Sequence, residues 1–97
     1  MLIAEAHISS PKSRQYLAQL CKHFGHKVAV EWDEANGFVD FGPGTCRMKA
    51  DEAVLGIHCE AETMEGLERV KYIVEDHVVR FGWREGVSVT WVDKSDA

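Results

Sequence analysis

Two segments with helical periodicity enclose a longer segment in which apolar and polar residues alternate. The first helical segment begins near Pro11, because proline suits the first turn of a helix, and Ser10 can cap it. Gly25 is expected to end this helix in a left-handed conformation. The second segment extends from about Thr63 to Phe81. Each segment has a single apolar stripe, so each helix has one face to bury. The stripe residues are Tyr16, Leu17, Leu20, Cys21 and Phe24 in the first segment, and Met64, Leu67, Val70, Val74, His77 or Val78, and Phe81 in the second.

Six other segments alternate with a period of two, which is typical of half-buried strands. They are residues 2–8, 28–32, 38–41, 45–50, 53–61 and 87–91. The four middle segments are joined by connections of hairpin length, which makes that part of the sheet antiparallel. The sequence therefore predicts an α+β fold in the order β-α-β-β-β-β-α-β, with two layers and both helices on one face of an antiparallel sheet.

Length and composition indicate one ordinary globular domain. The 97 residues are 45% apolar and 28% charged, and no window approaches the roughly 20 apolar residues of a membrane span. We expect residues 1–92 to form a single domain and residues 93–97 to be a disordered tail. The first residues do not resemble a signal peptide, so we expect a cytoplasmic protein without a membrane partner. The net charge of −5 argues against nucleic acid as a partner.

The cysteines are predicted to be reduced and buried. There are three of them and no export signal, which argues against a disulfide framework. Cys21, Cys46 and Cys59 all fall on apolar faces, where burial makes a thiol a poor nucleophile.

A hairpin turn at Asp51 and Glu52 would set how two of these thiols are placed. With that turn, Cys46 faces Ile57 and Cys59 faces Gly44 across the two strands. Cys46 and Cys59 are then diagonal neighbours, roughly 7–8 Å apart between Cα atoms. That distance is too long for an easy disulfide.

The segment QLCKHFGHKV, residues 19–28, combines one cysteine, two histidines and two lysines. Successive helical residues rotate by about 100°, so Cys21 and His23 lie about 200° apart and cannot bind one metal ion from an intact helix. We interpret Cys21 as a core residue and His23 as a complement to the negative end of the helix dipole. His26 follows Gly25, so its direction stays open.

Other residues able to do chemistry have simple structural interpretations. The segment FGPGTC, residues 41–46, favours a rigid β-turn over an anion-binding backbone nest. His7 and His58 fall on the polar sheet face and can approach each other only if their strands are neighbours. His77 is interpreted as a hydrogen-bonded residue at the edge of its stripe. Trp83 is expected to fold over the edge of the core, with docking of a partner as the alternative.

Three stretches resemble a bacterial family, the domain of unknown function family 2218. They are SRQYLAQLCKHFGHKVAVEWD, GFVDFGPGTC and VVRFGWREGVSVTW, and the similarity extends from about Ile3 to Trp91. The chain departs from the family pattern at Trp83, where a phenylalanine is expected, and at Gly42-Pro43. The resemblance implies a two-helix antiparallel α+β fold and no established activity. It also implies a link to iron uptake, because members occur beside siderophore-interacting flavin reductases.

We therefore expect a small binding or accessory module of the bacterial cytoplasm, with no cofactor, rather than an enzyme. Its partner would be a small ligand or another protein, such as a siderophore-interacting flavin reductase. The candidate site lies where the first helix meets the FGPGTC segment. The alternative is a metal carrier or small enzyme that uses His26 with Cys46, which requires an accessible Cys46 thiolate. No CxxC pair or HExxH motif identifies a metal ion. The candidate ligand-binding residues are His23, His26, Lys27 and Cys46.

Overall fold

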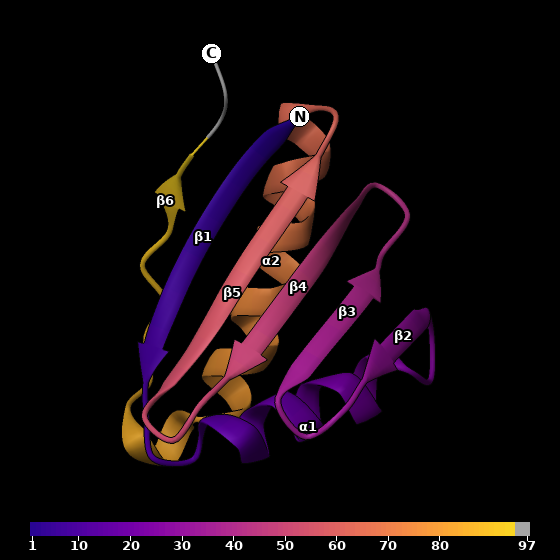
Figure 1. Cartoon of the computed structure of the whole chain (residues 1–97). Helices are drawn as coiled ribbons and strands as arrows, with labels where there is room; N and C mark the ends of the chain where they lie inside the picture. Colours follow the sequence, from indigo (N-terminus) through magenta and orange to yellow (C-terminus); the bar gives the residue numbers. More distant parts are fainter. Residues whose placement is uncertain (95–97) are drawn as a thin grey trace.

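The computed structural model describes residues 1–94, which fold into two layers (Figure 1). One layer is a six-stranded sheet in the order β2-β3-β4-β5-β1-β6, in which all neighbouring strands are antiparallel. The other layer holds the two α-helices, so the predicted α+β fold is confirmed. The elements are β1 (Leu2–Ser9), α1 (Ser13–Phe24), β2 (Ala29–Trp32), β3 (Asn36–Asp40), β4 (Gly44–Ala50), β5 (Val54–Ala61), α2 (Met64–Phe81), the short 3-10 helix η1 (Trp83–Glu85) and β6 (Val92–Asp93).

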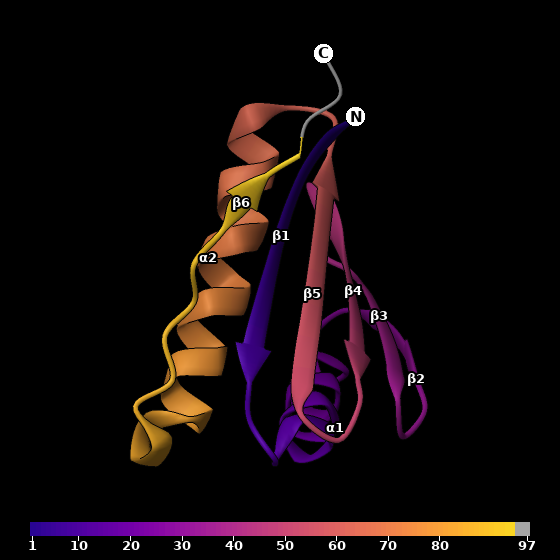
Figure 2. The same cartoon turned by 60° about the vertical axis from the view of Figure 1, so that its left-hand side comes forward.

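Both helices cover the same sheet face, and the other face stays open (Figure 2). Helix α2 packs against β1, β4 and β5, whereas α1 packs against β2 to β5. Alternate residues of each long strand are buried, as the period of two predicts. The largest fully buried side chains are Leu17, Leu20, Leu55, Ile57, Leu67, Val39, Val70, Val74, Val78, Cys21, Cys46 and Cys59. No helix within residues 1–94 is long and apolar enough to cross a membrane.

The hairpin between β4 and β5 differs from the prediction. Its central residues are Glu52 and Ala53, not Asp51 and Glu52, because the Asp51 N–H donates to the Val54 carbonyl at 3.1 Å. The Asp51 carboxylate also accepts the N–H groups of Ala53 and Val54, at 2.8 and 2.7 Å. Aspartate favours this first position of a turn for that reason. Moving the turn by one residue shifts the pairing by two.

The shifted pairing brings Cys46 directly opposite Cys59, instead of diagonal to it. Hydrogen-bonded pairs alternate with non-hydrogen-bonded pairs from the Asp51–Val54 turn onward, and this alternation makes Cys46–Cys59 a non-hydrogen-bonded pair. Such pairs have Cα atoms about 4.5 Å apart, which lies within the range of a disulfide. The prediction that these thiols are too far apart for a disulfide was wrong, although both are buried as predicted.

The segment after α2 also differs from the prediction. Residues 87–91 do not form a strand, and the last strand is only Val92–Asp93, which pairs with Ala4 and Glu5. Before it, the chain packs against the core edge, and the indole N–H of Trp91 donates to Glu75 on α2 at 2.8 Å. Packing against α2 thus replaces pairing with β1 along this stretch.

The predicted disordered tail is ordered where the structure describes it. Asp93 belongs to β6, and the Lys94 N–H donates to the Ile3 carbonyl at 2.8 Å. Both contacts extend the sheet edge beyond the predicted domain end. Residues 95–97 of the predicted tail lie outside the described residues.

Helix α1 begins later and ends differently than expected. It begins at Ser13, and Ser10 instead accepts the Lys12 N–H in the turn before it. Gly25 has φ −61° and ψ −16°, so it is right-handed and not left-handed. A left-handed residue is not needed there, because the next N–H groups donate to the carbonyls of His23 and Phe24.

Trp83 does not cover the core edge. Its side chain is 68% exposed, and the Arg84 guanidinium lies 5.4 Å from its ring centre. The favoured interpretation was wrong, because η1 turns this residue outward at the end of α2.

Candidate functional site

The end of α1 does meet the FGPGTC segment, as predicted, and a pocket of about 260 Å³ lies between them. Of the predicted residues, His23 and Lys27 line this pocket. His26 and Cys46 do not. We call this cavity the imidazole pocket. It is lined by His23, Phe24, Lys27, Val28, Phe41, Ile73 and His77.

Aromatic and imidazole rings form the walls of the imidazole pocket. The ring centres of His23 and His77 lie 4.6 Å apart, and those of Phe24 and His77 lie 5.0 Å apart. Phe41 meets Phe24 edge to face at 5.0 Å. These separations are typical of favourable ring packing, so the rings that line the pocket stabilise one another's positions.

The FGPGTC segment is a tight turn, as predicted, and it brings Phe41 to the pocket. Gly42 has φ +96°, which favours glycine, and the Phe41 N–H donates to the Gly44 carbonyl at 3.0 Å. The Asp40 carboxylate accepts the Gly42 N–H at 2.9 Å. The turn is thereby closed by its own side chain and backbone.

The protonation of the two imidazoles follows from their contacts. His77 Nδ1 lies 2.7 Å from the Ile73 carbonyl, so Nδ1 carries the proton and donates. In the neutral ring, Nε2 then has a free lone pair. Burial lowers the pKa of His23, and the nearby His77 and Lys27 lower it further.

The lining residues of the pocket thus include apolar rings, an imidazole able to accept a hydrogen bond, and a lysine. Such a combination is typical of sites for small molecules, which bury apolar surface and fix orientation with a few polar groups. Sequence reasoning missed His77, which it assigned to the edge of the apolar stripe. Its place on that stripe indicated only that it lies near the core, and not that it meets α1.

The sulfur atoms lie elsewhere. Cys46 is fully buried on the inner face of β4, and the pKa of its thiol is raised well above the usual range by a hydrogen bond with Cys59 and by burial. Burial also raises the pKa of Cys21 to about 11. Within residues 1–94, no group of three or more histidine, cysteine, aspartate and glutamate side chains is arranged to hold a metal ion.

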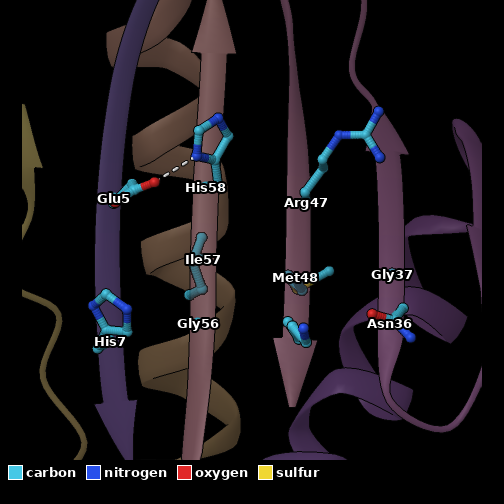
Figure 3. Close-up of a pocket in the computed structure, with 10 residues that line it drawn as sticks. Glu5, His7, Asn36, Gly37, Arg47, Met48, Gly56, Ile57 and His58 are labelled. Atoms are coloured by element: carbon cyan, nitrogen blue, oxygen red, sulfur yellow. Dashed lines mark hydrogen bonds and ion pairs between the residues drawn. The ribbon is translucent and has the colours of Figure 1, made fainter. Parts of the chain in front are cut away.

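The open sheet face carries a second cluster (Figure 3). Strands β1 and β5 are neighbours, so His58 lies beside Glu5, while His7 lies opposite Gly56. His58 Nδ1 is 2.7 Å from Glu5, and Nε2 is 2.9 Å from Glu60. The hydrogen bonds to Glu60 and Glu5 raise the pKa of His58, against the effect of burial. The Lys94 ammonium completes the cluster at 3.0 Å from Glu5.

The comparisons with known proteins concern the fold and the family. The NMR structure of PA4090 from Pseudomonas aeruginosa is similar over 100% of both chains, with a TM-score of 0.83 and 27% identity. No curated protein matches the chain. The model of one bacterial family matches residues 5–92, which confirms the resemblance seen in the sequence. The chain therefore belongs to the family described as "Uncharacterized protein conserved in bacteria (DUF2218)".

Proposed function

We propose that this protein is a non-enzymatic binding module that holds a small aromatic hydroxy acid in the imidazole pocket. The observation that carries the proposal is the pair of imidazoles 4.6 Å apart, packed on phenylalanine rings beside Lys27. An aromatic ring would pack against Phe24 and Phe41. A phenolic hydroxyl would donate to Nε2 of His77, and the carboxylate would face the Lys27 ammonium.

The proposed ligand class connects with iron handling. Hydroxylated aromatic acids bind ferric iron through adjacent oxygen atoms, and the family resemblance implies a link to iron uptake. From the same family resemblance we propose a siderophore-interacting flavin reductase as the protein partner. We also propose that the module works in the bacterial cytoplasm. The module would then hold or pass on an iron-binding aromatic acid and would need no cofactor of its own.

The alternative, a metal carrier or enzyme that uses His26 with Cys46, has less support. It needs an accessible thiolate, whereas Cys46 is fully buried with a raised pKa. His26 is exposed at the end of α1 and does not line the pocket that receives His23.

The test is an amide NMR titration of the reduced protein with 2,3-dihydroxybenzoate, with benzoate and cyclohexanecarboxylate as comparison acids. We expect saturable shifts at His23, Phe41 and His77, with the dihydroxy acid binding most tightly. The titration is repeated with zinc and with ferric iron, each in the presence and absence of the dihydroxy acid. Shifts with zinc alone at His23 and His77 would support a metal carrier instead.

Two histidines at the end of α1 provide a matched pair of variants. His23→Ala removes a wall of the pocket, whereas His26→Ala removes an exposed ring that does not line it. We expect His23→Ala and Lys27→Gln to weaken binding by at least about tenfold, which corresponds to about 1.4 kcal/mol. Equal binding by His23→Ala and His26→Ala would refute the proposed site.

A further inference from the structure

The open sheet face has a second hollow, which is independent of the imidazole pocket and of the function proposed for it. The hollow has a volume of about 270 Å³ and lies over Gly56, on the face opposite the helices (Figure 3). Four directly paired residues cross it from strand to strand. They are His7 on β1, Gly56 on β5, Lys49 on β4 and Asn36 on β3.

Gly56 creates the floor of this hollow. A Cβ atom at Gly56 would lie 3.8 Å from Cδ2 and 4.0 Å from Nε2 of His7, so the imidazole edge stands at ordinary contact distance above the glycine. The missing side chain leaves a gap between His7 and Lys49, whose strands are roughly 10 Å apart because two strand spacings separate them. A small group can therefore enter between an imidazole and an ammonium.

The charges around the hollow are unevenly paired. Glu5 and Glu60 are both engaged by His58, and Glu5 is also paired with Lys94. With His58 protonated, this cluster of two carboxylates and two cations is neutral.

Arg47 and Lys49, one strand further along, have no such partners. Among the ion pairs formed by residues 1–94, none involves either side chain. Arg47 lies over the Phe38 ring, 4.6 Å from its centre. The Lys49 charge acts on the Asp51 carboxylate, but within residues 1–94 neither cation is held in an ion pair, in a chain with a net charge of −5.

From this arrangement we propose that the hollow over Gly56 binds an oxyanion, the carboxylate or phosphate group of a small molecule. The anion rests on Gly56, where it contacts Nζ of Lys49 and Nε2 of His7, and Arg47 attracts it from the rim. Charge-assisted hydrogen bonds of this kind are stronger than neutral ones. The carboxylates of Glu5 and Glu60 repel the anion less than free carboxylates would, because Glu5 is paired with Lys94 and both accept hydrogen bonds from His58 in its protonated form.

The experiment is an amide NMR titration with potassium phosphate and, separately, sodium citrate, each compared with sodium chloride at matched ionic strength. We expect saturable shifts at His7, Lys49 and Gly56 with at least one oxyanion and not with chloride. Preference for phosphate or for citrate identifies the group that the site takes, and either supports the proposal. Chloride producing the same shifts would overturn it, because the effect would then be general screening.

Matched variants test the two parts of the site. Lys49→Gln removes the ammonium, and Gly56→Val places a side chain on the floor, where its Cβ would lie 3.6 Å or more from every other atom. Lys22→Gln is the control, because Lys22 is an exposed lysine on α1 in the other layer. We expect the first two variants to raise the dissociation constant at least tenfold and the control to leave it unchanged. Wild-type affinity in Lys49→Gln, with a native amide spectrum, would refute the site.

Discussion

Gly44 allows β4 to approach both β5 and α2, and its replacement by alanine should destabilise the protein strongly. A Cβ atom at Gly44 would lie 2.5 Å from the Glu60 carbonyl oxygen and 3.0 Å from both the Ala61 Cβ and the Val70 Cγ2. The first two are a backbone atom and a Cβ, so no side-chain rotation can relieve those contacts. The strands or the helix must move apart instead.

The size of the effect follows from two opposing contributions. Overpacking a well-packed core costs about 1–3 kcal/mol, and the backbone clash places Gly44→Ala at the upper end. Replacing a glycine inside a strand by alanine returns about 0.5–1 kcal/mol. The net loss in the free energy of unfolding should be about 2 kcal/mol, which lowers the midpoint of thermal unfolding by roughly 8–16 °C in a domain of this size.

Urea unfolding followed by tryptophan fluorescence and by circular dichroism measures this loss directly. Gly56→Ala is the control, because it makes the same chemical change on the neighbouring strand with no atom closer than 3.6 Å to the added Cβ. We expect that variant to be unchanged or more stable, by up to about 1 kcal/mol. If Gly44→Ala stayed within about 0.5 kcal/mol of the wild type, the close packing of β4 on β5 and α2 would be refuted.

Three further predictions concern the thiols, the open face and α2. The three thiols should react with a thiol reagent only as fast as the protein unfolds, because all are fully buried; rapid labelling of Cys46 in the folded protein, measured by mass spectrometry, would contradict this. The pKa of His58 in the folded protein is raised above 6.5, its value in the unfolded chain. The protonated His58 therefore contributes its full stabilisation below pH 6.5, and this stabilisation is lost as the pH rises through the pKa of the folded protein. The lowered pKa of His23 acts below pH 6.5 with the opposite sign, and the buried thiols with raised pKa values act only where the unfolded chain begins to lose thiol protons, near pH 8.5. Urea unfolding between pH 6.5 and 7.5 should therefore show a decline that His58→Gln removes. Thr63→Ala should cost about 1 kcal/mol in urea unfolding, because the Thr63 hydroxyl accepts the Gly66 N–H at 3.0 Å, and no loss would mean that this cap does not stabilise α2.

The periodic parts of the fold could be predicted from the sequence because their signals are local. Alternation in residues 45–50 and the stripe from Leu67 to Val78 report which side of an element is apolar, and burial in the structure follows both. The stretch after Gly82 was predicted wrongly for the same reason. Val87 and Val89 alternate as in a strand, but they pack against the core edge without pairing, and alternation alone cannot distinguish these two outcomes.

The candidate pocket could be predicted only in part, because it depends on which elements meet. The end of α1 and Phe41 were expected together from the resemblance, whereas His77 comes from α2, more than fifty residues after His23 in the chain. Helical periodicity placed His77 on the face toward the sheet. It could not indicate that α1 would lie against that part of α2.

The hollow over Gly56 depends even more on long-range pairing, and a single turn residue decides its chemistry. With the turn first expected at Asp51 and Glu52, Gly56 would have faced Arg47, whose guanidinium lies over Phe38. The turn actually forms around Glu52 and Ala53, since the Asp51 carboxylate accepts the N–H groups that follow it. Gly56 therefore faces Lys49, and the placement of β1 beside β5 adds His7 on the other side. A local hydrogen-bonding preference of one aspartate thus selects which cation borders the floor of the open face, and no pattern within a single strand could have revealed it.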